Sequence, residues 1–370
     1  MRVDVRTDRL RIADVGTADR AAWAALAGRA LEPNPFFEPG LAMPAARHLP
    51  GGGRAELLVV RTDERWLACV PVRRRPKWSD LLLPCVRAWN HDYCFLSTPL
   101  VDRDALDVAA HALRAAPRRW PGRAFLALEA MGDGPLAGAL PTHAAPGRPA
   151  PAVHSGFDRA VLRRRPDDTY VDGAASGRRR RERRRTRRIL ERELGGTATL
   201  VDATEDPAAL DRLLALEAAG WKGAAGTALT SDPEHEAFVR ETWDDFHGRG
   251  RGHLLELRVG DRIAASVLCL SAGDVVFSLK MGHDETLRAG APGVHLMADA
   301  ATWFHGRPEF ALFDSCAVRD NAMINALWPD RRRIVSPVLP AGGLPGRAAQ
   351  AALRRHALRA GPPGGDTIRP

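Results

Sequence analysis

The sequence feature that most constrains the fold is a set of three apolar, β-prone runs that follow one another closely, at residues 253–259, 262–270 and 275–281. A Gly-Asp pair separates each run from the next, and such pairs are typical of tight hairpin turns. The spacing leaves no room for a helix between the runs. The three runs therefore predict an antiparallel meander of neighbouring strands.

The last of these strands opens a longer stretch, 275–305, in which strand, glycine-bearing loop and helix follow in that order. The loop is expected at 282–293 and an amphipathic helix at 295–305. Free backbone N–H groups and the positive end of the helix dipole meet at such a point. The stretch therefore predicts an anion cradle, for which a pyrophosphate is the usual ligand. An ordinary strand-to-helix connection also uses Gly and Pro and is the alternative.

Length and composition limit the class of protein. A chain of 370 residues suits two domains, and 45% hydrophobic with 27% charged residues is typical of a globular protein. No apolar run reaches the roughly 18–20 residues that cross a bilayer, and the N-terminus lacks the apolar core of a signal peptide. The five cysteines are scattered without a CxxC pair. We therefore expect a cytoplasmic protein with no membrane span, no metal and no disulfide framework.

The first half of the chain alternates helix and strand patterns. Strands are expected at 9–15, 56–61, 66–73, 124–130 and 157–162, helices at 18–30, 41–48 and 103–115, and a loop at 132–151.

The second half restarts the same order after a long polar helix at 177–194, which Gly195 closes as a C-cap. Besides the meander, strands are expected at 197–202, 309–313 and 333–338, and helices at 206–220 and 233–247. The repeated order predicts a duplicated α/β (α+β) unit, each copy with a mixed, mostly antiparallel sheet flanked by helices.

The long polar helix carries much of the net charge of +9 and reads RRRRERRRTRRILERELGG. Such a run is typical of nucleic-acid or membrane-surface binding. It has no interleaved aromatic residues, however, and Glu182, Glu191 and Glu193 stand at helical spacings from arginines. These features favour a solvated or domain-bridging helix.

Three stretches give the second half a resemblance to the GNAT-type N-acyltransferase superfamily. They are the basic helix 178–194, the segment LEAAGWKGAAGTAL at 216–229, and the strand–loop–helix at 277–304. The second is similar to the E…WKG..GTAL signature of the CelD-like (cellulose-biosynthesis-associated) group. That group is in turn similar in architecture to the Fem-type tandem-GNAT ligases.

The resemblance implies tandem GNAT-like domains. The expected division is a degenerate N-terminal domain at 1–170, a basic linking helix at 171–196, an acyltransferase domain at 197–340 and a Gly/Pro-rich tail at 341–370.

The resemblance also implies acyl-CoA, with an acetyl or longer chain, as the donor. The acceptor would be an amine of a small molecule, sugar or peptide precursor. The GNAT loop pattern is Arg/Gln-x-x-Gly-x-Gly/Ala, and this chain has Ala291 at the first Gly position and Pro292, which lacks an N–H, next to it. The expected cofactor-binding residues are Arg288, Gly290, Ala291, Gly293, Val294 and His295.

Amide formation from a thioester needs a neutral amine, a polarised carbonyl and a proton for the leaving thiolate. Asp314, Glu217 and His283 are the expected catalytic residues, because a carboxylate or an imidazole can take the proton of the amine. The alternatives are a turn residue for Asp314, an exposed helical carboxylate for Glu217 and a solvated loop histidine for His283. Cys316 is either a nucleophile or a buried structural cysteine.

Polar residues near these positions are expected to bind the acceptor. The candidates are Trp221, Lys222, Lys280, Asn321 and Asn325. Lysine occurs only three times in the sequence, which makes Lys222 and Lys280 informative.

Two other functions stay open at this point. A Fem-like enzyme would take an aminoacyl-tRNA as donor and bind it through Arg178–Arg188. A degenerate GNAT domain would instead be a non-catalytic binding module in polysaccharide or secondary-metabolite assembly.

Overall fold

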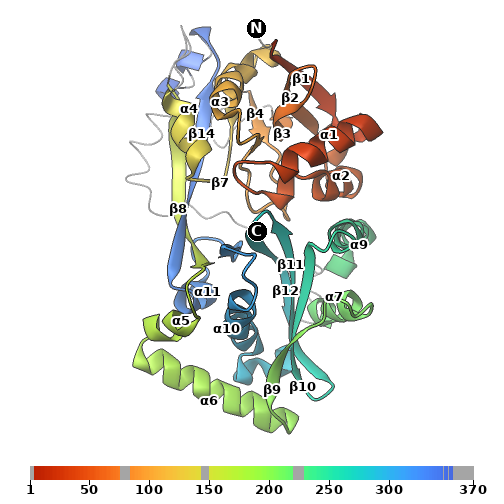
Figure 1. The fold of residues 1–370 in the computed structure, drawn as a ribbon, viewed down its shortest axis with the longest axis vertical. Coiled ribbons are helices and arrows are strands. Elements are labelled where there is room, and N and C mark those ends of the chain that lie inside the picture. The colour runs from red at the N-terminus through yellow and green to blue at the C-terminus, as the bar shows by residue number, and fades with distance from the viewer. Residues whose placement is uncertain are drawn as a thin grey trace. The chain divides into compact units, whose positions relative to one another are not determined.

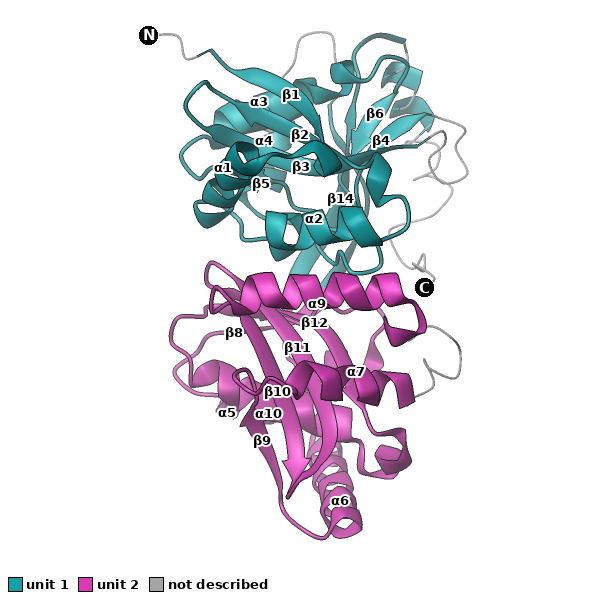
Figure 2. Ribbon diagram, turned by 90° about the vertical axis from the view of Figure 1, so that its right-hand side faces the viewer, with its two compact units in different colours: residues 1–158, 332–370 teal, residues 159–331 magenta. Residues whose placement is uncertain are grey.

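The computed structural model describes residues 4–75, 84–142, 150–219, 229–344, 346–348 and 350–352. The chain forms two compact units, which Figure 2 shows in teal and magenta. Unit 1 comprises residues 1–158 and 332–370, and unit 2 comprises residues 159–331. The chain passes between the units within two strands, β8 (Ala152–Arg163) and β14 (Asp330–Pro340). The division into four consecutive segments stays a prediction.

Unit 1 contains a sheet in the order β1-β2-β3-β4-β6-β14, with β5 paired to β3 and β7 paired to β14. Its other strands are β1 (Arg6–Arg11), β2 (Glu56–Arg61), β3 (Trp66–Arg75), β4 (Cys85–Ala88), β5 (Leu100–Val101), β6 (Phe125–Ala127) and β7 (Met131–Gly132). Its helices are α1 (Thr17–Gly28), α2 (Pro39–His48), α3 (Leu106–Ala115) and α4 (Pro135–Thr142). Helices α1 and α3 both pack against β3.

Unit 2 contains a sheet in the order β8-β13-β12-β11-β10-β9. Its strands besides β8 are β9 (Ala198–Asp202), β10 (Gly252–Val259), β11 (Arg262–Ala272), β12 (Val275–His283) and β13 (Leu312–Asp314). Its helices are α5 (Thr169–Ala174), α6 (Gly177–Leu194), α7 (Ala209–Ala219), α9 (Pro233–His247), α10 (Pro292–His305) and α11 (Ala322–Leu327).

The meander predicted from the three apolar runs is confirmed as β10, β11 and β12, which pair antiparallel in sequence order. Gly260 and Gly273 adopt positive φ angles of 56° and 52° at the two turns, a conformation that favours glycine. Helices α7 and α9 cover one face of this sheet and α10 covers the other (Figure 1). Both faces are therefore buried, which explains why β10, β11 and β12 are apolar along most of their length.

The basic helix α6 has the predicted bounds. The Ser176 side chain caps its start by accepting a hydrogen bond from the Arg179 N–H, and Gly195, with φ 74°, ends it. Its Leu190 side chain is buried in the core around α10. The helix packs against α10 and against the 3-10 helix η6 (Glu285–Gly290), all within unit 2.

The predicted fold class is confirmed, but three local predictions were wrong. The first strand ends at Arg11, where a 3-10 helix (Ile12–Asp14) begins. The segment 132–151 holds α4, because Leu136 and Leu140, four residues apart, bury one face of a helix. The segment 282–293, predicted as a turn-rich loop, contains η6 and the start of α10.

Candidate active site

The candidate site lies where the pairing of two parallel strands of unit 2 ends. Strands β12 and β13 pair over three positions, and the last pair is Phe277 with Asp314. Strand β13 ends there, whereas β12 continues to His283. Residues 278–283 therefore have a strand neighbour in β11 but none in β13. Alternate backbone N–H and C=O groups along this edge are left available to a ligand.

A β-bulge lies at the start of this open edge. Lys280 pairs with Leu268 and Ser278 pairs with Cys269, so Leu279 is an extra residue in β12. A bulge bends its strand and changes the direction of the backbone groups that follow. The bulge and the end of β13 thus coincide. We call residues 278–283 of β12, which extend beyond the end of β13, the opening between β12 and β13.

The face of β12 toward α7 brings two predicted site residues together. The Lys280 Nζ lies 2.6 Å from Glu217 Oε1, and both side chains are largely buried. Glu217 Oε2 also accepts a hydrogen bond of 3.0 Å from the Leu229 N–H. Gly282 permits this approach, since a Cβ there would lie 3.2 Å from the Glu217 backbone nitrogen. The alternative of an exposed helical carboxylate for Glu217 is wrong, because its side chain is 2% exposed.

Asp314 lies on the same face. Its neighbour Phe313 packs in the core beneath α10, and side chains alternate along a strand. Asp314 is fully buried, its Oδ1 accepts a hydrogen bond of 2.8 Å from the Cys316 N–H, and Arg159 Nη1 lies 3.6 Å away. Cys316 has φ 55°, a sparsely populated conformation for a residue with a side chain. Asp314 and Arg159 thus hold a strained turn at the end of β13.

His283 lies on the opposite face, toward α10. A Cβ added to Gly293 would lie 4.0 Å from His283 Nδ1 and 3.4 Å from Met281 Cε. The structure therefore places His283 beside the start of α10, and places Glu217, Lys280 and Asp314 on the other side of the sheet.

The start of α10 holds part of the predicted anion cradle. Ala291 has φ 49° and precedes the helix, and its carbonyl accepts the N–H groups of Val294 and His295 at 3.0 and 3.3 Å. Among the described residues, the Gly293 N–H has no backbone acceptor. The cradle therefore offers fewer donors than the sequence predicts, with the Gly293 N–H as the open one. Arg288, which precedes it in the chain, is exposed.

Two of the predicted cofactor-binding residues face α6 instead. A Cβ at Gly290 would lie 2.8 Å from Leu190 Cβ, so glycine is needed for close packing. His295 is buried, with its Nε2 3.0 Å from Thr186 Oγ1. Burial, with smaller contributions from Arg187 and Arg183, lowers the pKa of His295 to about 4, which keeps the ring neutral at pH 7.

The remaining predicted substrate residues are placed as follows. Asn321 caps α11 by accepting a hydrogen bond of 3.2 Å from the Ile324 N–H. Asn325 donates to the Arg319 carbonyl at 2.6 Å, and its Oδ1 is buried without a hydrogen bond from any described residue. Trp221 and Lys222 lie outside the described residues. All the substrate-binding roles stay predictions.

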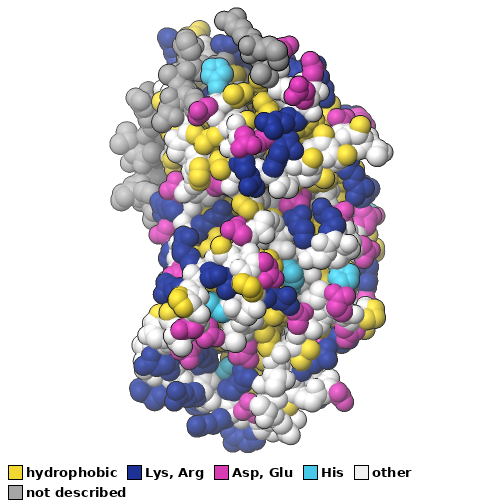
Figure 3. Space-filling model, in the orientation of Figure 1, with side chains coloured by type: hydrophobic (Ala, Val, Ile, Leu, Met, Phe, Trp, Pro, Cys, Tyr) yellow, Lys and Arg dark blue, Asp and Glu magenta, His cyan; other side chains and the backbone are white. Residues whose placement is uncertain are grey.

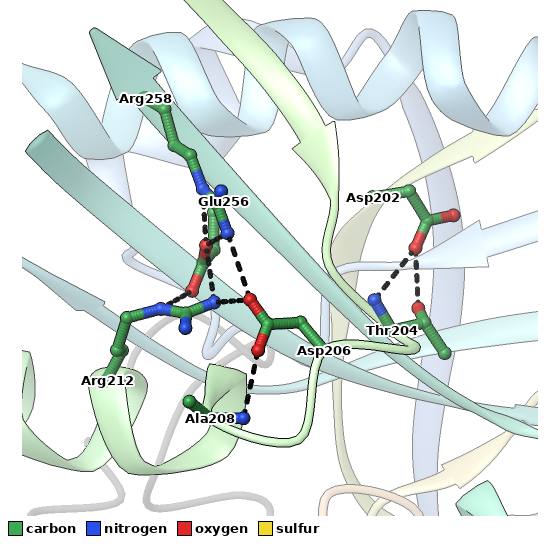
Figure 4. A network of polar contacts seen from close by, with 7 residues as sticks. All are labelled: Asp202, Thr204, Asp206, Ala208, Arg212, Glu256 and Arg258. Atoms are coloured by element: carbon green, nitrogen blue, oxygen red, sulfur yellow. Dashed lines mark hydrogen bonds and ion pairs between the residues drawn. The ribbon is translucent and has the colours of Figure 1, made fainter. Parts of the chain in front are cut away.

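An ionic network around the buried Glu256 holds α7, which carries Glu217, against the sheet (Figure 4). Glu256 of β10 is fully buried and accepts hydrogen bonds from Arg212 at 3.0 and 3.2 Å and from Arg258 at 2.7 Å. Arg212 also bonds Asp206 at 2.6 Å, and Asp206 caps the chain before α7 through the Ala208 N–H. Such a network fixes the position of α7 along β10, and this in turn fixes the position of the Glu217 carboxylate.

Sequence reasoning missed the bulge at Leu279, Arg159 and this network. A bulge cannot be recognised in an apolar stretch of sequence, because the bulged residue has the same β-propensity as its neighbours. The pairing of Arg159 with Asp314 depends on two residues that are 155 positions apart in the chain. One feature of the sequence indicates the network, since Glu256 is a charged residue inside a largely apolar run.

A cavity of unit 2 lies between α5, α6 and α10, with a volume of about 640 Å³. Its lining includes Arg183, Arg184, Arg187 and Arg188 of α6, and His295, Asp299 and Thr302 of α10.

No helix in the described part of the chain is long and apolar enough to cross a membrane. Within the same residues, no three His, Cys, Asp or Glu side chains are grouped as metal ligands would be.

Comparisons with known proteins agree with this geometry. Residues 177–319, which lie within unit 2, match the family model of the acetyltransferase (GNAT) domain. No curated protein sequence matches the chain.

Three solved structures are similar over nearly the whole chain, each with a TM-score of 0.54. The first is a conserved protein of unknown function from Bacteroides thetaiotaomicron, 10% identical over 91% of this chain and all of that one. The second is the C-terminal domain of a putative lysylphosphatidylglycerol synthetase from Agrobacterium fabrum, 13% identical over 93% of this chain and 96% of that one. The third is FemX, 9% identical over 94% of this chain and all of that one. At these identities the likeness concerns the fold alone, and the sequence match assigns a GNAT acyltransferase domain to 177–319.

Proposed function

We propose that unit 2 transfers an acyl group from acyl-CoA to an amine at the opening between β12 and β13. The observation that carries this proposal is the position of the opening, where a parallel strand pair ends, a bulge follows and a helix begins nearby. The GNAT family match of residues 177–319 supports it. The resemblance to the CelD-like group supports the same donor.

The residues at the opening fit an acyl-CoA in part. The open Gly293 N–H and the start of α10 favour an anion such as the pyrophosphate, and Arg288 adds a positive charge. The free edge of β12 at 278–283 can pair with the amide groups of an extended arm. Acyl-CoA would supply the thioester carbonyl and the thiolate leaving group.

The chain itself would position the amine and remove its proton. The amine nitrogen forms a bond to the thioester carbon, the C–S bond breaks, and the proton of the amine passes to a base. Glu217 is the proposed base, because it is buried beside the open edge and Lys280 holds its carboxylate at 2.6 Å. A backbone N–H of β12 near the bulge would polarise the carbonyl.

Asp314 acts in this proposal by fixing the turn at Cys316, and Arg159 by holding Asp314. His283 would lie beside the phosphates rather than beside the amine, because it faces α10. The acceptor-binding roles of Lys280, Asn321 and Asn325 are part of the same proposal.

Ligand-induced stabilisation of the full chain tests the donor. Acetyl-CoA at a hundred times its Kd should add about 2.7 kcal/mol to the free energy of unfolding. CoA release with a panel of small amines and amino sugars should then identify the acceptor class. If acetyl-CoA and longer acyl-CoAs all leave the melting temperature unchanged, the proposal is wrong.

A charged tRNA is the competing donor, and the exposed arginines of α6 are the observation in its favour. The same assay separates the two, since an aminoacyl-tRNA would support transfer in the absence of any acyl-CoA. A non-catalytic module would bind a ligand at the opening and release no CoA with any amine.

A further inference from the structure

The α6 helix presents a row of exposed arginines to solvent. The side chains of six of them make no hydrogen bond or ion pair with another described residue: Arg178, Arg179, Arg181, Arg184, Arg188 and Arg192. All six are exposed. Figure 3 shows Lys and Arg side chains gathered at the lower left, where α6 lies in Figure 1.

Four of these arginines form one stripe. Arg181, Arg184, Arg188 and Arg192 follow at intervals of three, four and four residues, so they share one face of the helix. The buried residues Thr186 and Leu190 are on the opposite face. Like charges at such spacings destabilise a helix by a few tenths of a kcal/mol per pair, roughly 0.2–0.5. The stripe is thus an unfavourable arrangement in the free chain.

Two members of the stripe, Arg184 and Arg188, also line the cavity between α5, α6 and α10. They are one turn apart, about 6 Å along the helix axis. A phosphate group accepts hydrogen bonds from two such guanidinium groups at once. The other two arginines of the cavity, Arg183 and Arg187, already have partners in Asp172 and Asp299.

The carboxylates that line the cavity are all occupied. Asp168 accepts a hydrogen bond of 2.5 Å from the Thr302 hydroxyl, Asp172 pairs with Arg183, and Glu191 and Asp299 pair with Arg187. His295 is buried against Thr186. The four arginines of the lining balance the charge of its four carboxylates, and Arg184 and Arg188 are the two arginines whose side chains make no ion pair with a described residue.

We propose that this cavity binds a small phosphorylated molecule, with the phosphate on Arg184 and Arg188 and the organic part between α6 and α10. The volume of about 640 Å³ is within the range of small-molecule pockets, roughly 300–1,000 Å³. Ala298, Ala301 and Val171 give it apolar walls and Thr169 a hydroxyl. A polyanion lying along α6 would use the whole stripe and would need no cavity, so the cavity favours a small ligand.

The test is isothermal titration of the full chain with pyrophosphate. We expect R184Q/R188Q to raise the Kd at least 10-fold. The matched control is R178Q/R179Q, which removes the same charge from the same helix at exposed positions outside the cavity. We expect its Kd to stay within 2-fold of the parent. Circular dichroism checks that all three proteins are equally helical.

Three results would overturn the proposal. Equal weakening by both double variants would mean general charge attraction. An unchanged Kd in R184Q/R188Q would place pyrophosphate elsewhere, for example at the start of α10. A 20-nucleotide RNA that binds more tightly than pyrophosphate, and that both double variants weaken equally, would make α6 a nucleic-acid surface.

Discussion

Each unit contains a parallel pair of strands, and the two pairs end differently. In unit 1, β4 pairs with β6 through Val86 and Arg87, and β4 stops one residue later. In unit 2, β12 runs on through His283 after its last pair with β13 and bulges at Leu279. The open edge that a ligand needs is therefore found in unit 2 and not at the end of β4.

The chain before α3 of unit 1 also differs from the start of α10 of unit 2. Before α3 of unit 1, the chain supplies its own anion: the buried Asp102 carboxylate accepts from Arg29 at 2.8 Å and from the Asp104 N–H at 3.1 Å. The first turn of α10 in unit 2 has no acidic residue, and the Gly293 N–H has no backbone acceptor among the described residues. This comparison supports the proposal that unit 2 carries the chemistry while unit 1 is structural.

The largest expected effect is that of E217Q on acyl transfer. Loss of the proposed base should lower the rate about 10³-fold. The matched control is E56Q in unit 1, where a buried carboxylate also pairs with a basic side chain, Arg9 at 3.0 Å. E56Q should leave the rate of the folded protein within 2-fold of the parent. Equal losses in the two variants, measured by CoA release, would remove the functional difference between the units.

The next prediction concerns acid stability. Because the pKa of His295 is lowered from 6.5 to about 4, the unfolded chain binds a proton between these values that the folded chain does not. The free energy of unfolding therefore falls as the pH falls from about 6.5 to about 4, by up to about 1.4 kcal/mol per pH unit from this group.

The variant H295L should reduce that slope by up to about 1.4 kcal/mol per pH unit, because it removes one titrating group. The Thr186 hydroxyl keeps its contacts with the carbonyls of Glu182 and Arg183 at 3.2 and 3.1 Å, so the loss of the ring leaves it bonded. Urea unfolding of parent and variant from pH 4.5 to 7 measures the difference. The same slope in both proteins would show that His295 titrates normally.

A smaller effect is expected from G293A. The added Cβ would be in ordinary contact with Met281 at 3.4 Å, so the protein should fold normally. A methyl group at the open N–H should raise the KM for acetyl-CoA about 10-fold, or about 1.4 kcal/mol. In G290A, by contrast, the Cβ clashes with Leu190 at 2.8 Å, so stability should fall as well. An unchanged KM in G293A would exclude this cradle.

The smallest effect is expected when glycine replaces an alanine that has a positive φ angle. Each unit has one such alanine, Ala130 with φ 56° and Ala291 with φ 49°. Glycine removes a strain of about 1–2 kcal/mol and costs about 0.5–1 kcal/mol in chain entropy. A130G and A291G should therefore each stabilise the protein by about 0.5 kcal/mol in urea unfolding. A291G alone should also change the KM for acetyl-CoA, by about 2-fold. A change of KM in A130G would contradict the assignment of the site to unit 2.

The sequence predicted the meander, α6 and α9 closely, because apolar period, turn glycines and caps are local signals. The proposed site includes the strand–loop–helix stretch that the sequence predicts as an anion cradle. It could not give the face of each residue, since one bulged residue at Leu279 decides which side Lys280 and His283 occupy. Nor could it show that Gly290 allows close packing against Leu190. A loop glycine that contacts a phosphate and one that contacts a helix cannot be distinguished by sequence alone.

Hydrogen exchange of the full chain with and without CoA tests the central claim most directly. If unit 2 binds the donor at the opening, amides of 278–283 and 290–295 should exchange more slowly with CoA bound, and those of 85–105 in unit 1 should not change. Protection in 85–105 with none in 278–295 would contradict the account.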